Sequence, residues 1–237
     1  MTIDKNDFLR YNRQMNLSEV GVEGQLQIKA AKVIVLGAGG LGSPILTYLA
    51  SCGVGTLAVV DYDNIEHHNL HRQILFTEQD INCSKTVKAA ERIQAINPHI
   101  TCIIYEEKLT KDNIPTILSS YDIVVDGTDN FETRYLVNDT CVRLGKTLVY
   151  GTILGFEGQL SVLNHQGSKN LRDLFPEPPS KEEVPNCSIH GVLGTFPGII
   201  GTMMAQETLK IILNLPVLTN QLLLIDTLQW QFTKLSY

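Results

Sequence analysis

Several features that mark common protein classes are missing from this sequence of 237 residues, and cysteine pairs are the first. Its five cysteines are scattered, with no CxxC pair among them. The N-terminus, MTIDKNDFLRYNRQ, is too polar for a signal peptide. An odd number of isolated cysteines without an export signal indicates free thiols in a reducing compartment. We therefore expect a cytoplasmic protein with neither a disulfide framework nor a zinc knuckle.

Long basic runs are also missing. Lysine and arginine number 19 against 25 acidic residues, which gives a formal net charge of −6. Because binding to nucleic acid requires clustered cations, we expect no general nucleic-acid partner. The stretch 187–206 carries no charged residue but contains His190, Pro197 and Gln206, so we interpret it as part of a buried helix. We expect no membrane span.

The chain does contain short apolar runs that alternate with segments of helical spacing. β-branched residues dominate the runs, which therefore predict buried strands. The predicted strands are KVIV, GTLAVVDYD, ITCIIYE, YDIVVDGTD and TLVYGT. The predicted helices lie near residues 7–31, with Gly21 and Gly24 interrupting the stretch, and near 41–52, 84–96, 110–118 and 131–144. This order predicts an α/β fold with a Rossmann-like, mostly parallel sheet and helices on both faces.

The pattern changes after Gly151. EGQLSVLNH predicts a strand that no helix follows, and residues 166–190 are predicted to form a long crossover loop. A helix near residues 192–213 and two antiparallel strands, QLLLIDT and WQFTKL, then complete the sheet. We expect one domain over residues 1–237, with a helical arm at residues 1–30.

A glycine-rich turn follows the first predicted strand. GAGGLG places Gly37, Gly39 and Gly42 in GxGxxG spacing between a strand and a helix, and the second strand ends in Asp61. Such glycines permit close approach of the backbone to phosphate, and an acidic residue at this spacing can accept hydrogen bonds from ribose. The alternative is a turn that only packs the helix against the sheet.

Polar residues follow the second strand in DYDNIEHHNLHRQ. Asp61 and Asp63 form an acidic pair there, and Asn69, Arg72 and Gln73 come a few residues later, with Lys85 opening the next helix. A dinucleotide carries only a pyrophosphate, whereas a triphosphate has more charge and needs added cations. These side chains therefore favour ATP as the ligand. The three histidines 67, 68 and 71 have poor spacing for a metal cage.

DGTDN, at residues 126–130, ends the fourth strand at the same edge of the sheet. A carboxylate there can hold Mg²⁺ together with waters and phosphate oxygens. Asp129 is the candidate ligand. Asp126 could instead cap the following turn, and either carboxylate could begin the next helix as its N-cap.

Taken in order, these motifs resemble the MoeB/ThiF family, adenylyltransferases related to the ubiquitin-activating enzymes (HesA/MoeB/ThiF). The resemblance runs from about Arg10 to Phe232. It rests on RYNRQ, GAGGLGSP, DYD, NLHRQ, KT, INPHI, DGTDN with Arg134, and EGQL. Each piece is common, but the combination is specific.

The resemblance implies an ATP-dependent adenylyltransferase. Such an enzyme activates the C-terminal glycine of a small ubiquitin-like sulfur carrier protein, ending in Gly-Gly and of the ThiS or MoaD kind, as an acyl-adenylate. Pyrophosphate is released, and the activated carrier serves thiamine thiazole or molybdopterin synthesis. By motif, Gly40 would contact the phosphates, Asp61 the ribose, and Asn69, Arg72 and Lys85 the triphosphate.

The same resemblance implies a magnesium site and a dimer. Asp129 and Asn130 would lie near Mg²⁺ and the nucleotide. Arg13, in RYNRQ, would reach the ATP of the other subunit, so a homodimer is expected. No rhodanese-like sequence follows Tyr237. Sulfur would then come from a separate sulfurtransferase, or the activated carrier would have another use.

The sequence departs from the family pattern at two CxxC pairs that hold zinc in many members. The first pair should fall in SKNLRDLF, where Asn170 and Asp173 have the matching spacing, and the second should lie beyond Phe232. No zinc site is therefore expected. Cys187 stands where family members often carry a cysteine, which forms a persulfide or thioester link with the carrier in some relatives and is dispensable in others. It is either catalytic, with a pKa lowered by a helix N-terminus, or an ordinary free thiol.

Two other functions remain open from the sequence. The first is an NAD-dependent oxidoreductase that uses the same glycine turn. Two features weaken this hypothesis: the sequence predicts no separate substrate domain, and it contains the cationic cluster of Arg72 and Lys85. The second is a non-catalytic module that docks a ubiquitin-like protein, which would have no need of the complete set Arg13, Asp61, Arg72, Lys85 and Asp129.

Overall fold

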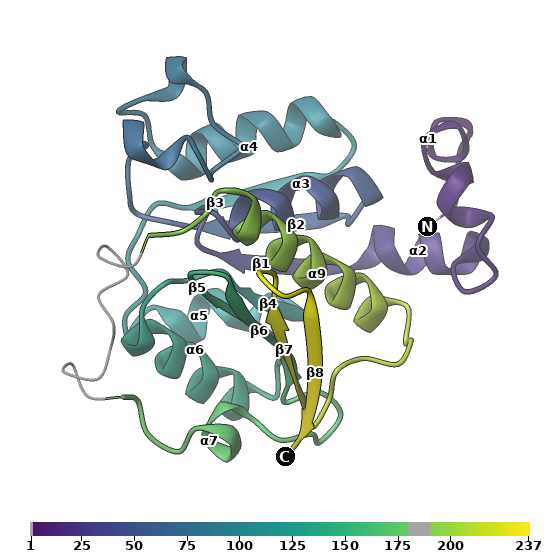
Figure 1. The fold of residues 1–237 in the computed structure, drawn as a ribbon. Helices are drawn as coiled ribbons and strands as arrows, with labels where there is room; N and C mark the ends of the chain where they lie inside the picture. The colour runs from purple at the N-terminus through teal and green to yellow at the C-terminus, as the bar shows by residue number, and fades with distance from the viewer. Residues whose placement is uncertain (1, 180–190) are drawn as a thin grey trace.

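One sheet organises the part of the chain that the computed structural model describes, residues 2–179 and 191–237 (Figure 1). Its strands follow the order β3-β2-β1-β4-β5-β6-β7-β8. The strands are β1 (Lys32–Leu36), β2 (Thr56–Val60), β3 (Thr101–Tyr105), β4 (Ile123–Asp126), β5 (Thr147–Leu154), β6 (Glu157–Leu163), β7 (Gln221–Asp226) and β8 (Gln231–Ser236).

The first five strands pair in parallel, and β5 to β8 pair antiparallel. The helices are α1 (Lys5–Met15), α2 (Gly21–Ala30), α3 (Gly42–Cys52), α4 (Lys85–Ile96), α5 (Ile114–Ser119), α6 (Phe131–Leu144), α7 (Leu171–Leu174) and α9 (Thr195–Ile212). Two short 3-10 turns, η1 (His67–Asn69) and η2 (Glu78–Asp80), lie between β2 and α4. This architecture confirms the predicted fold class.

Two hydrophobic clusters cover the two faces of the sheet. In β1, Val33 and Val35 join a cluster with α3, α4 and α9, whereas Ile34 and Leu36 join a second cluster with α5 and α6. Successive side chains of a strand point to opposite faces, so an unbroken apolar run is what a strand buried on both faces requires. Figure 1 shows α3 and α4 on one side of the parallel strands and α5 and α6 on the other.

Element boundaries differ from the prediction in three places. The helix expected over residues 7–31 is divided into α1 and α2, because a turn intervenes and Gly21 has a φ of +54°. The helix expected near 110–118 begins only at Ile114, with proline in its first turn, where a missing N–H does no harm. The predicted crossover loop contains the short helix α7 in its described part.

None of the helices that the structure describes combines the length and the apolar character needed to cross a bilayer. The longest of the elements given above, α9, packs against α3 and β5 instead. The uncharged stretch that begins α9 is therefore part of the core, as Phe196 and Ile200 show by their burial.

Candidate nucleotide site

The turn between β1 and α3 requires glycine at two positions for different reasons. Gly37 has a φ of +88°, a conformation that residues with a side chain rarely adopt. At Gly42, a Cβ atom would lie 1.9 Å from the carbonyl oxygen of Gly37, so α3 can approach β1 only without a side chain there. Gly39 is different, since its nearest neighbour would be the Gln73 amide at 3.8 Å. The turn therefore presents backbone, not side chains, to the space beside it.

The helix that follows the turn begins without a side-chain cap. Its N-cap is Leu41, which makes no side-chain capping hydrogen bond. Backbone N–H groups at a helix N-terminus carry a partial positive charge and bind anions. In a helix meant only to pack on the sheet, a serine or aspartate would usually satisfy these groups. The uncapped end fits a phosphate.

Asp61 holds the glycine turn against the end of β2. One oxygen of its carboxylate accepts a hydrogen bond from the N–H of Ala38 at 2.8 Å, and the other accepts one from the N–H of Asp63 at 2.9 Å. Each carboxylate oxygen has a second lone pair. Asp61 can thus order the turn and still accept hydrogen bonds from a ribose.

A cavity of about 670 Å³ lies beside this turn, at the carboxyl ends of the parallel strands. Ten of the residues that the sequence predicted to bind nucleotide line it: Gly37, Gly39, Gly40, Asp61, Asp63, Arg72, Gln73, Lys85, Asp129 and Asn130. Open α/β sheets bind their ligands at this edge, where the strand order reverses. Here the reversal falls between β1 and β4, the two strands that flank the cavity. We call this cavity the nucleotide pocket.

The segment after β2 builds one wall. Asn69 is buried, and its side-chain oxygen accepts a hydrogen bond from the N–H of Glu66 at 3.0 Å. It shapes η1 and does not itself line the pocket. Arg72 does, and one guanidinium nitrogen is held by the carbonyl of His68 at 2.9 Å. The same nitrogen lies 2.9 Å from Nε2 of His71, and the N–H groups of the other two guanidinium nitrogens remain for a ligand.

Gln73 has a buried side chain with an unusual feature. Its amide oxygen has no hydrogen-bond partner among the described residues, although the residue is only 3% exposed. A buried polar atom without a partner is costly unless a ligand or water supplies one. Gln73 lines the nucleotide pocket, but this oxygen is itself shielded from the pocket surface, and the amide nitrogen is the side-chain atom that lies near Gly39.

Lys85 opens α4 and is buried, which is uncommon for lysine. Its ammonium group lies 2.8 Å from a carboxylate oxygen of Asp63, which is about half exposed. The ion pair holds the ammonium group in place at the wall of the nucleotide pocket. The structure thus explains the acidic residue at position 63, which orients the lysine.

The loop after β4 supplies the carboxylates. Asp126 is fully buried, and one of its oxygens accepts hydrogen bonds from the N–H and the hydroxyl of Thr128 at 3.0 and 2.6 Å. The helix N-cap is Asn130, whose side chain accepts from the N–H of Thr133 at 2.9 Å. Asp129 comes directly before this N-cap and is exposed on the pocket wall.

An ion such as Mg²⁺ fits this wall. It takes one or two protein carboxylates and completes its shell with waters and phosphate oxygens. Asp129 offers one exposed carboxylate at the pocket. Among the residues that the structure describes, no three histidine, cysteine or acidic side chains gather as a metal cage would require. A metal held mainly by phosphate and water is the type that the donor set supports.

Two cations on the pocket walls were not among the predicted site residues. Lys108 follows β3, and Arg134 lies on α6. Arg134 is buried and donates hydrogen bonds to the carbonyls of Thr128 and Gly151, with its guanidinium over the ring of Tyr150 at 5.5 Å. In the sequence it stands out only as part of the family motif, because helical spacing does not show which side chains turn toward a strand end.

A second cavity, of about 640 Å³, adjoins the first. Both are lined by Phe131, Arg134, Thr152, Ile153 and Leu154, so they meet at this shared wall. The second cavity continues along the antiparallel strands and is bounded by residues of α6 and by the segment 171–179. We call it the second pocket.

Arg13 is not among the described residues that line these two pockets. Arg13 is exposed on α1, which Figure 1 shows to one side of the sheet, beyond α2. Cys187 lies outside the described residues, so both interpretations of it stay open. Elsewhere burial raises the pKa of Cys102 to about 11 and that of Cys141 to about 12. These two thiols are therefore protonated at neutral pH.

The buried carboxyl of Asp126 leads to a prediction about stability and pH. Burial raises its pKa, although the charge of Arg134 and hydrogen bonds from Thr128 act the other way. A raised folded pKa favours folding at a pH below the unfolded pKa, and this contribution is lost as pH rises through the folded pKa. Asp126→Asn cannot ionise. Relative to the wild type, we expect it to gain stability between about pH 4 and about pH 7.

Urea unfolding of both proteins at the two pH values measures the difference in the free energy of unfolding. A difference that stays constant, or that falls as pH rises, would contradict the assignment of a raised pKa to Asp126.

The sheet is mostly parallel, and its first strand is followed by a glycine turn, an uncapped helix and a pocket lined by cations. These features together define an α/β nucleotide-binding fold. The chain belongs to the ThiF family, because the model of that family matches residues 11–237. This match confirms the resemblance that the sequence motifs showed.

Two similar proteins carry descriptive names. "Adenylyltransferase and sulfurtransferase MOCS3" of Culex quinquefasciatus is 50% identical over 235 residues, which cover 99% of this chain and 54% of that protein. "Sulfur carrier protein adenylyltransferase" of Thermus thermophilus is 47% identical over 238 residues, which cover 98% of this chain and 88% of that protein. The chain thus spans about half the length of the MOCS3 relative.

Solved structures share the fold at lower identity. The structure of E. coli MccB with ATP has a TM-score of 0.81 and 20% identity, and the match covers 99% of this chain and 79% of that one. MccB in complex with N-formylated MccA has a TM-score of 0.86 and 21% identity, covering 98% and 73%. At this level of identity the likeness concerns the fold.

Proposed function

We propose that the chain is an ATP-dependent adenylyltransferase. Its substrate would be the C-terminal glycine carboxylate of a small ubiquitin-like sulfur carrier protein ending in Gly-Gly. The observation that carries the proposal is the pair of adjoining pockets, one cationic beside the glycine turn and one that continues along the antiparallel strands. The names of the relatives from Culex and Thermus support the same reaction.

The nucleotide pocket matches the charge of a triphosphate. The N–H groups at the start of α3 would hold phosphate oxygens, while Arg72 and Lys85 supply full positive charges. Asp61 would accept hydrogen bonds from the ribose. Asp129, with Asn130 beside it, would hold Mg²⁺, which neutralises part of the phosphate charge when bound.

The reaction requires no nucleophile from the protein. An oxygen of the glycine carboxylate attacks the α-phosphorus and forms an acyl-phosphate bond. The bond from that phosphorus to the bridging oxygen breaks, and its electron pair leaves with pyrophosphate. The protein must overcome repulsion between two anions and stabilise the departing charge. Arg72 and Lys85 are suited to this task because both are held in place before the ligand binds, by His68 and Asp63.

The second pocket offers a route for the carrier's tail. It meets the nucleotide pocket at the buried cation Arg134, so a chain lying in the second pocket would direct its terminal carboxylate to the phosphates. Side chains such as Phe131 and Leu154 line both pockets where they meet. Two terminal glycines suit a passage between such side chains, since glycine has no side chain to accommodate.

We also propose a homodimer. Arg13 is exposed on α1 and is absent from the described walls of its own nucleotide pocket. A second subunit could bring this guanidinium to the phosphates, which would complete the positive charge around ATP. The activated carrier would serve thiamine thiazole or molybdopterin synthesis, with sulfur supplied by a separate sulfurtransferase.

Exchange of labelled pyrophosphate into ATP tests this function. We expect exchange that depends on Mg²⁺ and on a Gly-Gly carrier from the same genome, and none with a carrier lacking its last glycine. Binding of NADH, followed by its fluorescence, provides the comparison. Tight NADH binding without carrier-dependent exchange would contradict the proposal and favour an oxidoreductase. Carrier binding without any exchange would favour a docking module.

A further inference from the structure

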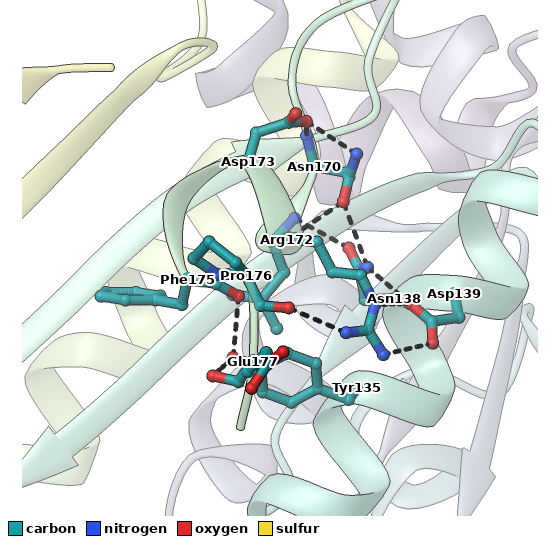
Figure 2. A network of polar contacts seen from close by, with 10 residues as sticks. Tyr135, Asn138, Asp139, Asn170, Arg172, Asp173, Phe175, Pro176 and Glu177 are labelled. Carbon is teal, nitrogen blue, oxygen red and sulfur yellow. Dashed lines mark hydrogen bonds and ion pairs between the residues drawn. The ribbon is translucent and has the colours of Figure 1, made fainter. Parts of the chain in front are cut away.

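One wall of the second pocket is a segment with little secondary structure. Residues 170–179 follow β6 and contain the single-turn helix α7 (Figure 2). Leu171, Phe175, Glu177 and Pro179 of this segment line the second pocket. Only Leu171 is buried among the hydrophobic side chains, whereas Phe175 is 37% exposed. Apolar packing therefore holds the start of the segment but not its end.

Polar side chains of α6 also hold the segment, at its start and further along. At the start of the segment, the side-chain oxygen of Asn138 accepts a hydrogen bond from the N–H of Leu171 at 2.9 Å, and its amide nitrogen donates to Asn170 at 3.3 Å. Asn170 and Asp173 cap α7 reciprocally. These are the two residues that occupy the spacing of a cysteine pair in many family members.

Arg172 makes the most extensive contacts, as Figure 2 shows. Two of its nitrogens donate to the two oxygens of Asp139 on α6 at 2.7 and 2.8 Å. A third donates to the carbonyl of Pro176 at 2.9 Å. The guanidinium also lies over the ring of Tyr135, 4.9 Å from its centre. The hydrogen bonds that Arg172 donates, together with its charge, hold the pKa of Asp139 below the usual value.

Tyr135 completes the arrangement from the same helix. Its hydroxyl lies 2.9 Å from the carbonyl of Phe175 and 2.8 Å from that of Glu177, and its one proton can be donated to either. Two side chains thus lie within hydrogen-bond distance of three carbonyls of the segment, at positions 175, 176 and 177, and can donate to two of them at a time. We call Tyr135, Asp139 and Arg172 the α6 clamp.

The exposure of the ion pair in the α6 clamp argues against a role of the clamp in overall stability. Arg172 and Asp139 are 43% and 46% exposed, and ion pairs with this exposure contribute little to the stability of a fold. The effect of the clamp is local, because Arg172 and Tyr135 donate to backbone carbonyls that have no secondary structure to satisfy them, while Asp139 holds Arg172 in place. The clamp fixes the path of the wall, and with it the shape of the second pocket.

We infer that the α6 clamp is a positioning device for the acyl substrate. α6 borders both pockets, with Phe131 at their shared wall. Tyr135 and Asp139, the two clamp residues on this helix, lie one and two turns further along. The clamp holds residues 175–179 where the tail of a carrier protein would pass, and it does not contact the nucleotide pocket. It sets the affinity for the carrier and leaves the affinity for ATP unchanged. This inference rests on the proposed function.

Arg172→Met tests the clamp, because methionine keeps much of the side-chain length but none of the hydrogen bonds. With a Gly-Gly carrier from the same genome in the pyrophosphate exchange assay, we expect the KM for the carrier to rise about tenfold. The KM for ATP and kcat should stay within about twofold of the wild type. A loss of general folding would instead lower the apparent kcat, by reducing the active fraction, and leave both KM values unchanged.

Arg143→Met is the matched control. Arg143 is exposed, as Arg172 is, but it lies on α6, and among the described residues its side chain donates a hydrogen bond only to Thr140 in the same helix, at 3.5 Å. It should keep wild-type kinetics. Tyr135→Phe, which retains the ring and loses only the hydroxyl, provides a second variant should Arg172→Met fold poorly. It should raise the KM for the carrier by a smaller factor.

The outcomes separate the two proposals. If the wild type exchanges pyrophosphate only with carrier, and Arg172→Met and Tyr135→Phe keep the wild-type KM for the carrier, the clamp inference is wrong and the proposed function stands. An equal rise in the KM for ATP would also overturn it. If the wild type shows no carrier-dependent exchange, the proposed function itself fails, and the inference fails with it.

Discussion

Replacing Arg72 or Lys85 by alanine is expected to lower carrier-dependent turnover by about two orders of magnitude, the usual scale for the loss of one preorganised charge. Both side chains line the nucleotide pocket and both are already held in position, Arg72 by a backbone carbonyl and Lys85 by Asp63. Such groups stabilise developing charge on pyrophosphate without reorganising. Steady-state pyrophosphate exchange at saturating carrier measures the effect.

Lys88→Ala is the control for Lys85→Ala. It also lies on α4, but it pairs with Glu91 at 2.8 Å and does not line the pocket. We expect it to retain nearly normal turnover, while its unfolding should differ little from that of the wild type. Near-normal rates in both Arg72→Ala and Lys85→Ala would show that these cations do not act on the phosphates.

The second large effect concerns the fold of the turn. Gly42→Ala is expected to lower the free energy of unfolding by about 3 kcal/mol, the upper range for an overpacked site. The new methyl carbon would lie 1.9 Å from the carbonyl oxygen of Gly37. That oxygen belongs to the backbone, so it cannot move aside as the end of a flexible side chain could. The helix must then move away from β1. Equilibrium urea unfolding measures the loss.

Gly39→Ala separates folding from binding at the same turn. A Cβ atom there would meet nothing closer than 3.8 Å, so the variant should unfold like the wild type. Its methyl would nevertheless stand at the wall of the nucleotide pocket. We expect its KM for ATP to rise about tenfold, as for a lost or obstructed phosphate contact. Equal stability of Gly42→Ala and Gly39→Ala would contradict the packing argument.

The sequence accounts well for the strands and for the glycine turn. Their formation depends on neighbours along the chain: β-branched runs for strands such as β1 and β4, and the spacing of Gly37, Gly39 and Gly42. It accounts less well for helix ends. The start of α5 depended on one proline, and the division of the N-terminal helices depended on a turn before Gly21.

Candidate site residues divide in the same way. Asp61, Arg72 and Lys85 could be found because each follows a strand end or opens a helix, and parallel strands bring those points to one edge. Asn69 came from the same segment, yet its side chain shapes η1. Which way a side chain turns within a loop depends on hydrogen bonds that spacing does not reveal.

The sequence by itself determined the order of strands and helices, the glycine turn and the family, because these are patterns of neighbouring residues. The tertiary structure alone decided which distant residues share a wall. It placed Arg134 between two pockets and brought Tyr135 and Asp139 of α6 against residues 172–177. Such contacts join segments more than 30 residues apart, and packing of the whole sheet, not any local preference, sets their distance.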